Sequence, residues 1–134
     1  MTIAYAVETE LAAEEFADVL VRSTLAERRP VDDLGRLDQM LRRADIVVTA
    51  RHEGLLVGVS RALSDGAHVT YLADLAVDVA HQRAGIGREL IRRTRDVGGL
   101  GCTLVLLAAP AARGYYPKIG MLAHDSCWVI PRDR

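Results

Sequence analysis

The sequence predicts an α/β domain in which helices cover the faces of a mixed, mostly antiparallel sheet. The spacing of apolar residues is helical near the N-terminus, alternates in the middle and becomes helical again later. Two strand-like segments in the middle are joined by a short turn, which makes them antiparallel. A later helix lies between two strands, and such a crossover makes that pair parallel. The length of 134 residues and the ordinary share of charged residues, 26%, fit one domain over residues 1–134.

The N-terminal third predicts one edge strand and two helices. Residues 3–7 form a short apolar run. Residues 10–25 place Phe16, Val19 and Leu20 at helical spacing. Pro30 disfavours helix in the residue before it and so ends this segment. Either Asp32 or Asp33 can then cap a second helix, whose apolar face is formed by Leu34, Leu37, Met40 and Leu41.

The middle of the chain predicts three consecutive strands. Residues 46–51 and 55–63 are rich in β-branched and apolar side chains and flank a turn at residues 52–54. Asp65 and Gly66 form a favoured tight-turn pair, which leads into a third strand from His68 to about Val77.

The last part predicts a helix over residues 86–97, ended by Gly98 and Gly99, and a buried strand over residues 102–108. A short helix at 111–119 and a final strand at 127–130 complete the chain. Cys102 and Cys127 both lie in apolar runs, so we expect buried free thiols.

Composition argues against several function classes. A net charge of −1 disfavours nucleic-acid binding, and the two cysteines lack metal-ligand spacing, so no metal site is expected. No signal-peptide pattern or membrane-length apolar run occurs. We therefore expect a cytoplasmic protein that binds no membrane.

The segment Gln82-Arg83-Ala84-Gly85-Ile86-Gly87 lies between a predicted strand and the start of a predicted helix. Its glycines permit positive φ and a close approach to the backbone, and the unpaired amides of a helix start suit a phosphate. The dinucleotide pattern requires a third glycine where Leu90 stands, and no Gly-Lys-Ser/Thr occurs. The alternative is a glycine-containing helix start without a ligand.

Three ordered segments resemble the GCN5-related N-acetyltransferase (GNAT) family: Tyr71–Val77, the Gln82-x-x-Gly85-x-Gly87 loop, and Tyr115–Met121. The resemblance implies a GNAT-like sheet of about six to seven strands flanked by about four helices, with acetyl-CoA as co-substrate. It also implies that the pantetheine arm pairs with the backbone of Leu75, Ala76 and Val77, and that the pyrophosphate is held by Gln82, Arg83, Ala84, Gly85, Ile86, Gly87 and Arg88. The chain departs from the family at Ala108-Ala109-Pro110, where an Asn is frequent, and at Met121, which replaces an aromatic residue.

The resemblance implies catalytic roles for Tyr116, as the proton donor to the departing thiolate, and for Asp74, as the general base. Alternation places Asp74 on one face with Leu72 and Ala76, among apolar neighbours. The alternative for Asp74 is a structural hydrogen bond near a strand irregularity.

The family implies transfer of an acetyl group to a primary amine of a small molecule or peptide, by direct attack in a ternary complex. It also leads us to expect a homodimer. One alternative is a non-catalytic acyl-CoA-binding or sensor module of the same fold. Acylation of aminoacyl-tRNA by a toxin is a further alternative, but the net charge of −1 argues against RNA binding.

Overall fold

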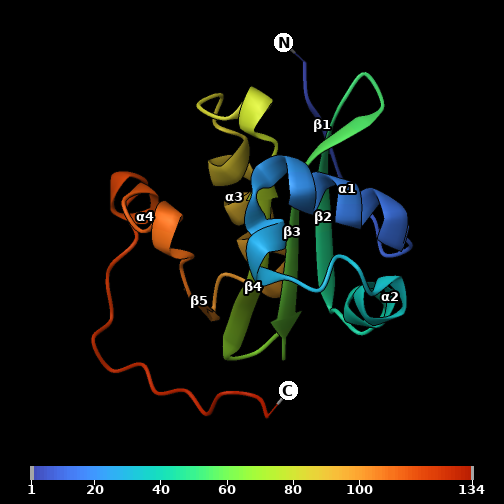
Figure 1. Ribbon diagram of the computed structural model, residues 1–134. Coiled ribbons are helices and arrows are strands. Elements are labelled where there is room, and N and C mark those ends of the chain that lie inside the picture. Colours follow the sequence, from blue (N-terminus) through green and yellow to red (C-terminus); the bar gives the residue numbers. More distant parts are fainter. Residues whose placement is uncertain (1, 134) are drawn as a thin grey trace.

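The computed structural model describes residues 2–133 (Figure 1). Short 3₁₀ helices lie at Leu25–Arg28, Val79–His81 and Pro110–Ala112. The strands and α-helices follow the order β1 (Ala4–Val7), α1 (Ala13–Ser23), α2 (Leu34–Arg42), β2 (Ile46–His52), β3 (Leu55–Ser64), β4 (Val69–Val77), α3 (Ile86–Gly98), β5 (Thr103–Leu106) and α4 (Tyr115–Lys118).

The five strands form one sheet in the order β1-β2-β3-β4-β5. The pairs from β1 to β4 are antiparallel, and β4 pairs with β5 in parallel across the α3 crossover. The mixed, mostly antiparallel sheet is as predicted. The expected six to seven strands are wrong, because residues 127–130 form no strand.

Two apolar cores lie on opposite faces of this sheet (Figure 1). One face is covered by α1 and α2, whose buried side chains include Phe16, Leu20 and Leu37. The other face is covered by α3 through Ile86 and Leu90. The predicted cap of the second helix is confirmed for Asp33, whose side chain accepts the backbone N–H of Arg36 at 3.0 Å.

A β-bulge interrupts the pairing of β3 with β4. Arg61 lies opposite Asp74, but the next residue, Ala62, lies opposite Leu72, so Ala73 is one residue in excess. The bulge shifts the alternation of β4, and Leu72 packs in the α3 core while Ala76 packs in the α1–α2 core. The expectation that Leu72 and Ala76 share a face is therefore wrong.

The parallel pairing of β4 with β5 stops early. It runs only from Val69 opposite Thr103 to Leu72 opposite Leu106, whereas β4 continues to Val77. The predicted strand 102–108 is correspondingly shorter. Within residues 2–133, no strand pairs with this edge of β4 after Leu72. The sheet therefore opens between β4 and β5.

The C-terminal part differs most from the expectation. The predicted helix 111–119 is broken into a 3₁₀ helix and the single turn α4, with Gly114 between them. After a turn at residues 119–120, residues 121–133 form an irregular segment without helix or strand that leaves the body of the domain (Figure 1). Trp128 is 89% exposed and Ile130 is 97% exposed. Cys102 is buried as expected, but Cys127 is exposed, because no neighbouring strand covers it.

Candidate functional site

The predicted phosphate-binding loop leads directly into the N-terminus of α3. Arg83 and Gly85 both adopt positive φ, 66° and 79°, which turns the chain sharply before the helix. A Cβ on Gly85 would meet no atom within 4 Å. The N-cap residue Gly85 has no side chain to cap α3, so the first amide groups of the helix, before that of Arg88, which lies beside the Tyr115 hydroxyl, are available to a ligand. These amides and the helix dipole form a cradle suited to a phosphate group.

Gly87 in this cradle packs against Tyr115. A Cβ at Gly87 would lie 2.9 Å from the Tyr115 hydroxyl oxygen, which is closer than side chains tolerate. Burial raises the pKa of the Tyr115 hydroxyl, and the charge and backbone of Arg88 partly oppose that effect. Contact between Tyr115 and the loop was not predicted from the sequence, since the two segments are separated by β5. The contact places the aromatic segment beside the start of α3.

The open edge of β4 carries the residues expected to meet the pantetheine arm. Leu75, Ala76 and Val77 pair with β3 along one edge only. The carbonyl oxygen of Val77 accepts a hydrogen bond from the Gln82 side-chain amide at 3.1 Å. Gln82 therefore ties the loop to the strand and occupies one acceptor of this edge. The other groups of the edge can pair with an extended ligand as an added strand would.

Asp78 fixes the start of the loop. Its buried carboxylate accepts a hydrogen bond from the backbone N–H of Ala80 at 2.9 Å and forms an ion pair with Arg22 of α1. Burial raises the pKa of Asp78, but these partners more than compensate, so the pKa is lowered overall. Nδ1 of His81 lies 3.7 Å from the same carboxylate. This cluster anchors the loop to α1.

Tyr116 is half-buried, and its ring lies 5.3 Å from that of Tyr115 in an edge-on arrangement. Burial raises the pKa of the Tyr116 hydroxyl, and Tyr115 adds to this effect. A hydroxyl with a raised pKa stays protonated at neutral pH. Tyr116 therefore has the protonation state that a proton donor requires.

Asp74 has surroundings unlike those expected. Its side chain is fully buried, but its neighbours are charged rather than apolar. One carboxylate oxygen accepts Nε–H of Arg29 and the other accepts Nε–H of Arg61. Arg29 also donates to the carbonyl oxygen of Ala73 at 2.9 Å, at the bulge. These contacts match the alternative of a structural bond at a strand irregularity, and they join β4 to the segment between α1 and α2.

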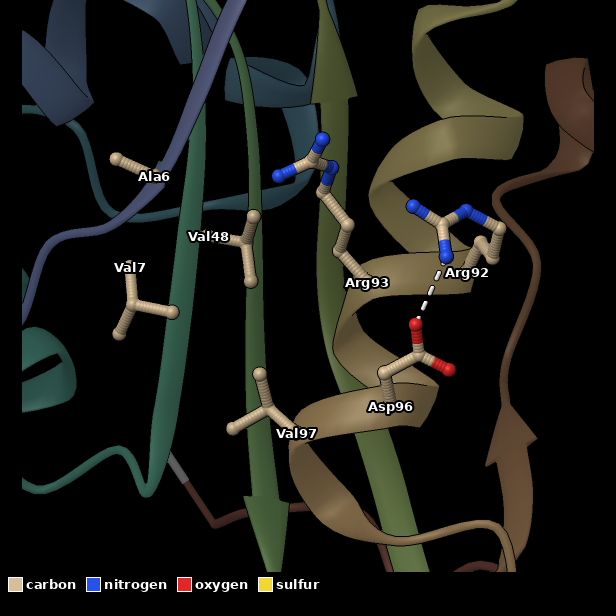
Figure 2. Close-up of a pocket in the computed structure, with 7 residues that line it drawn as sticks. All are labelled: Ala6, Val7, Val48, Arg92, Arg93, Asp96 and Val97. Atoms are coloured by element: carbon tan, nitrogen blue, oxygen red, sulfur yellow. Dashed lines mark hydrogen bonds and ion pairs between the residues drawn. The ribbon is translucent and has the colours of Figure 1, made fainter.

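Arg92 and Arg93 lie in the middle of α3, after the first turn that contains Arg88. Arg92 bridges Glu89 and Asp96, and Arg93 pairs with Glu89 at 2.7 Å and lies over the ring of Tyr5. These side chains border a surface pocket between α3 and the first two strands (Figure 2). Arg92 and Arg93 are therefore largely neutralised by Glu89 and Asp96.

The described residues also bear on membrane-spanning helices and metal sites. Residues 2–133 contain no helix that is both long and apolar enough to cross a membrane. In the same range, no three side chains of His, Cys, Asp or Glu gather in a way that could hold a metal ion.

Comparison with known proteins gives one family and one fold. The chain matches the acetyltransferase (GNAT) domain over residues 43–120, which include β2 to α4 and every predicted site residue. No curated protein matches the sequence.

Solved structures share the fold along nearly the whole chain. A GNAT-family acetyltransferase from Streptococcus pneumoniae has 20% identity and a TM-score of 0.77, with 99% of each chain covered. A ribosomal-protein-alanine N-acetyltransferase from Brucella melitensis has 24% identity and a TM-score of 0.75, covering 98% of this chain and 100% of the other. An aminoglycoside N-acetyltransferase in complex with CoA has 17% identity and a TM-score of 0.75, covering 99% and 96%. Because the domain match spans more than half of the sequence, the chain belongs to the GNAT acetyltransferase family.

Proposed function

We propose that this protein is an N-acetyltransferase that moves an acetyl group from acetyl-CoA to a primary amine by direct attack in a ternary complex. The observation that supports this most is the open edge of β4 beside the uncapped start of α3. An extended arm that ends in a pyrophosphate fits this combination, since the strand edge offers backbone pairing and the helix start offers amides. CoA has both parts. One solved structure of the same fold is a complex with CoA.

The attacking amine must be deprotonated, whereas the departing CoA thiolate must be protonated. A lysine-like amine has a pKa of about 10.4, so deprotonating it at pH 7 costs about 4–5 kcal/mol. The neutral nitrogen attacks the thioester carbonyl carbon, the carbon–sulfur bond breaks, and the amine proton leaves to a base or water. In this proposal the Tyr116 hydroxyl protonates the thiolate. A thiol has a pKa of about 8.5, so this step needs less assistance than amine deprotonation.

Asp74 as the general base remains a prediction. Both of its oxygens already accept guanidinium N–H groups, so an approaching ammonium would have to displace Arg29 or Arg61. The contacts favour Asp74 as a positioning residue, and a water molecule as the carrier of the amine proton. The same contacts favour the second candidate function, an acyl-CoA-binding or sensor module without transfer, because they occupy both oxygens of the candidate base.

The proposed acceptor is a small-molecule or peptide amine, and no nucleic-acid partner is expected. We also expect a homodimer. The exposed Trp128 and Ile130 lie in a segment with β-forming residues, and β5 is the last strand of the sheet. Sedimentation equilibrium tests this expectation, because a monomeric mass at micromolar concentration would contradict it.

Isothermal titration with acetyl-CoA, followed by thiol release across amine classes, tests the function. Binding with amine-dependent release that falls in Tyr116→Phe supports the transferase. Binding without release from any amine class supports the sensor module. If acetyl-CoA does not bind at all, both functions are rejected. Tyr71→Phe is a matched control, since Tyr71 is also half-buried but lies where β4 is still paired with β5.

A further inference from the structure

A surface pocket of about 280 Å³ lies between α2 and β3, apart from the α3 loop. Three guanidinium groups, one carboxamide and two apolar side chains border it, and no carboxylate does. The lining residues are Arg36, Gln39, Met40, Arg43, Arg61 and Leu63. A pocket bordered by several cations and no anion is electrostatically suited to a negatively charged group.

Two of the three guanidinium groups of this pocket, those of Arg36 and Arg43, are not neutralised by nearby carboxylates, whereas Arg61 pairs with Asp74. Within residues 2–133, neither Arg36 nor Arg43 has a carboxylate within 4.0 Å. Three of the aspartates close in sequence are engaged elsewhere: Asp33 caps α2, Asp38 pairs with Arg42, and Asp45 accepts the amide N–H of Ser64. Asp32 also forms no ion pair with Arg36 within the described residues. The two exposed arginines can therefore turn toward a ligand without breaking an ion pair.

Arg61 is the fixed member of the group. Its side chain is only 11% exposed, its Nε–H donates to Asp74, and its Nη1 lies 3.5 Å from the carbonyl oxygen of Met40. Among the described residues, Nη2 of Arg61 has no acceptor. A guanidinium that is held in place and keeps free N–H groups binds an anion with little loss of side-chain entropy.

Arg61 also connects the pocket with the proposed reaction. It lies opposite Asp74 in the sheet, and Asp74 immediately precedes Leu75 on the open edge of β4. The buried cluster of Arg29, Asp74 and Arg61 contains two cations and one anion. An acceptor with its amine beside β4 and its acidic group in the pocket would have both ends bound.

We propose that this pocket binds a carboxylate or phosphate group, and that this group belongs to the amine acceptor. Arginine pairs with both anions through two parallel N–H bonds, so the shared chemistry is an oxyanion. The first half of the proposal concerns the pocket alone. The second half rests on the proposed acetyl transfer.

The first experiment titrates the protein with inorganic phosphate, at saturating CoA, and follows the arginine Nε–H signals by NMR. The Arg61 signal should shift, and the double variant Arg36→Gln/Arg43→Gln should weaken phosphate binding at least about tenfold. The double variant Arg95→Gln/Arg132→Gln removes the same charge outside the pocket and should leave binding unchanged. An unmoved Arg61 signal, or equal binding by the pocket variant, overturns the site.

The second experiment compares primary amines that carry a carboxylate with their uncharged amides. The acids should have a kcat/KM about tenfold higher, and Arg36→Gln/Arg43→Gln should abolish this preference. Equal use of acid and amide overturns the assignment to the acceptor and leaves a site for a free anion. If no amine is acetylated while Arg61 still responds to phosphate, the proposed transfer fails and the pocket site stands.

Discussion

Replacing the buried carboxylate of Asp74 should destabilise the whole domain. Asp74→Asn keeps the shape of the side chain but leaves two guanidinium groups without their counter-ion. Breaking a buried ion pair costs about 3–5 kcal/mol. Asp74 is 0% exposed, but Arg29 and Arg61 are 22% and 11% exposed, so we expect the lower end, about 3 kcal/mol. For 134 residues each kcal/mol lowers Tm by roughly 3–4 °C, and Tm should therefore fall by about 10 °C.

Thermal unfolding followed by far-UV circular dichroism measures this change, with Asp38→Asn as the control. Asp38 pairs with Arg42 at 3.2 Å but is 54% exposed, and such pairs contribute about 0–1 kcal/mol. Its Tm should move by no more than about 3 °C. The reasoning is refuted if the two variants unfold at the same temperature. An Asp74→Asn protein that keeps its Tm but loses turnover would instead identify Asp74 as the base.

Three further predictions concern the loop, the proton donor and a turn. Gly85→Ala and Gly66→Ala both place a side chain at positive φ in open space, so each variant should lose about 1 kcal/mol of stability. Only Gly85→Ala should weaken acetyl-CoA binding, by about tenfold in calorimetry, because only Gly85 lies at the start of α3. Equal affinities of the two variants for acetyl-CoA would contradict this. Tyr116→Phe should lower kcat for thiol release about tenfold with an unchanged KM for acetyl-CoA, and an unchanged kcat would exclude the proposed donor. Backbone N–H groups, that of His68 foremost, lower the pKa of Asp65 from 3.8 to about 2, so its stabilisation is complete above pH 4 and is lost as the pH falls toward 2. Between pH 4 and 2 the urea midpoint of Asp65→Asn should fall less than that of the unchanged protein, because other carboxylates such as Asp78 and Glu89 still titrate there, and an equal fall in both proteins would contradict the role of Asp65.

Much of the fold was predictable because each element carries its own local signal. The helix over residues 86–97 shows a clear three-to-four spacing and two terminal glycines, and α3 spans Ile86–Gly98 with Gly99 as its cap. The predicted strand at 127–130, which is absent from the structure, also has a local signal, since its residues favour β structure. A strand, however, requires a neighbour to accept its backbone hydrogen bonds, and the sequence does not show which neighbour is present.

The sequence predicted the features of the candidate site that depend on local backbone conformation. It did not predict the features that depend on side chains from distant parts of the chain. Gly85 and Gly87 indicated a sharp turn and a close approach, and both are present. The surroundings of Asp74 were misjudged, because Arg29 comes from a segment 45 residues away and because the bulge at Ala73 places Leu72 on the face opposite that of Ala76. No periodic pattern in a single strand reports such a bulge.

The bulge at Ala73 also sets how this strand tolerates changes in length. Pairing of β4 with β3 continues on both sides of the extra residue, so Leu72 faces α3 while Ala76 faces α1 and α2. Deleting Ala73 would produce a regular strand, but every side chain on one side of the deletion would then point to the opposite face of the sheet. Core side chains such as Leu72 or Ala76 would change core, and polar side chains would become buried. Natural or engineered length variation in this domain should therefore be confined to turns such as that at Asp65, and β4 should keep nine residues.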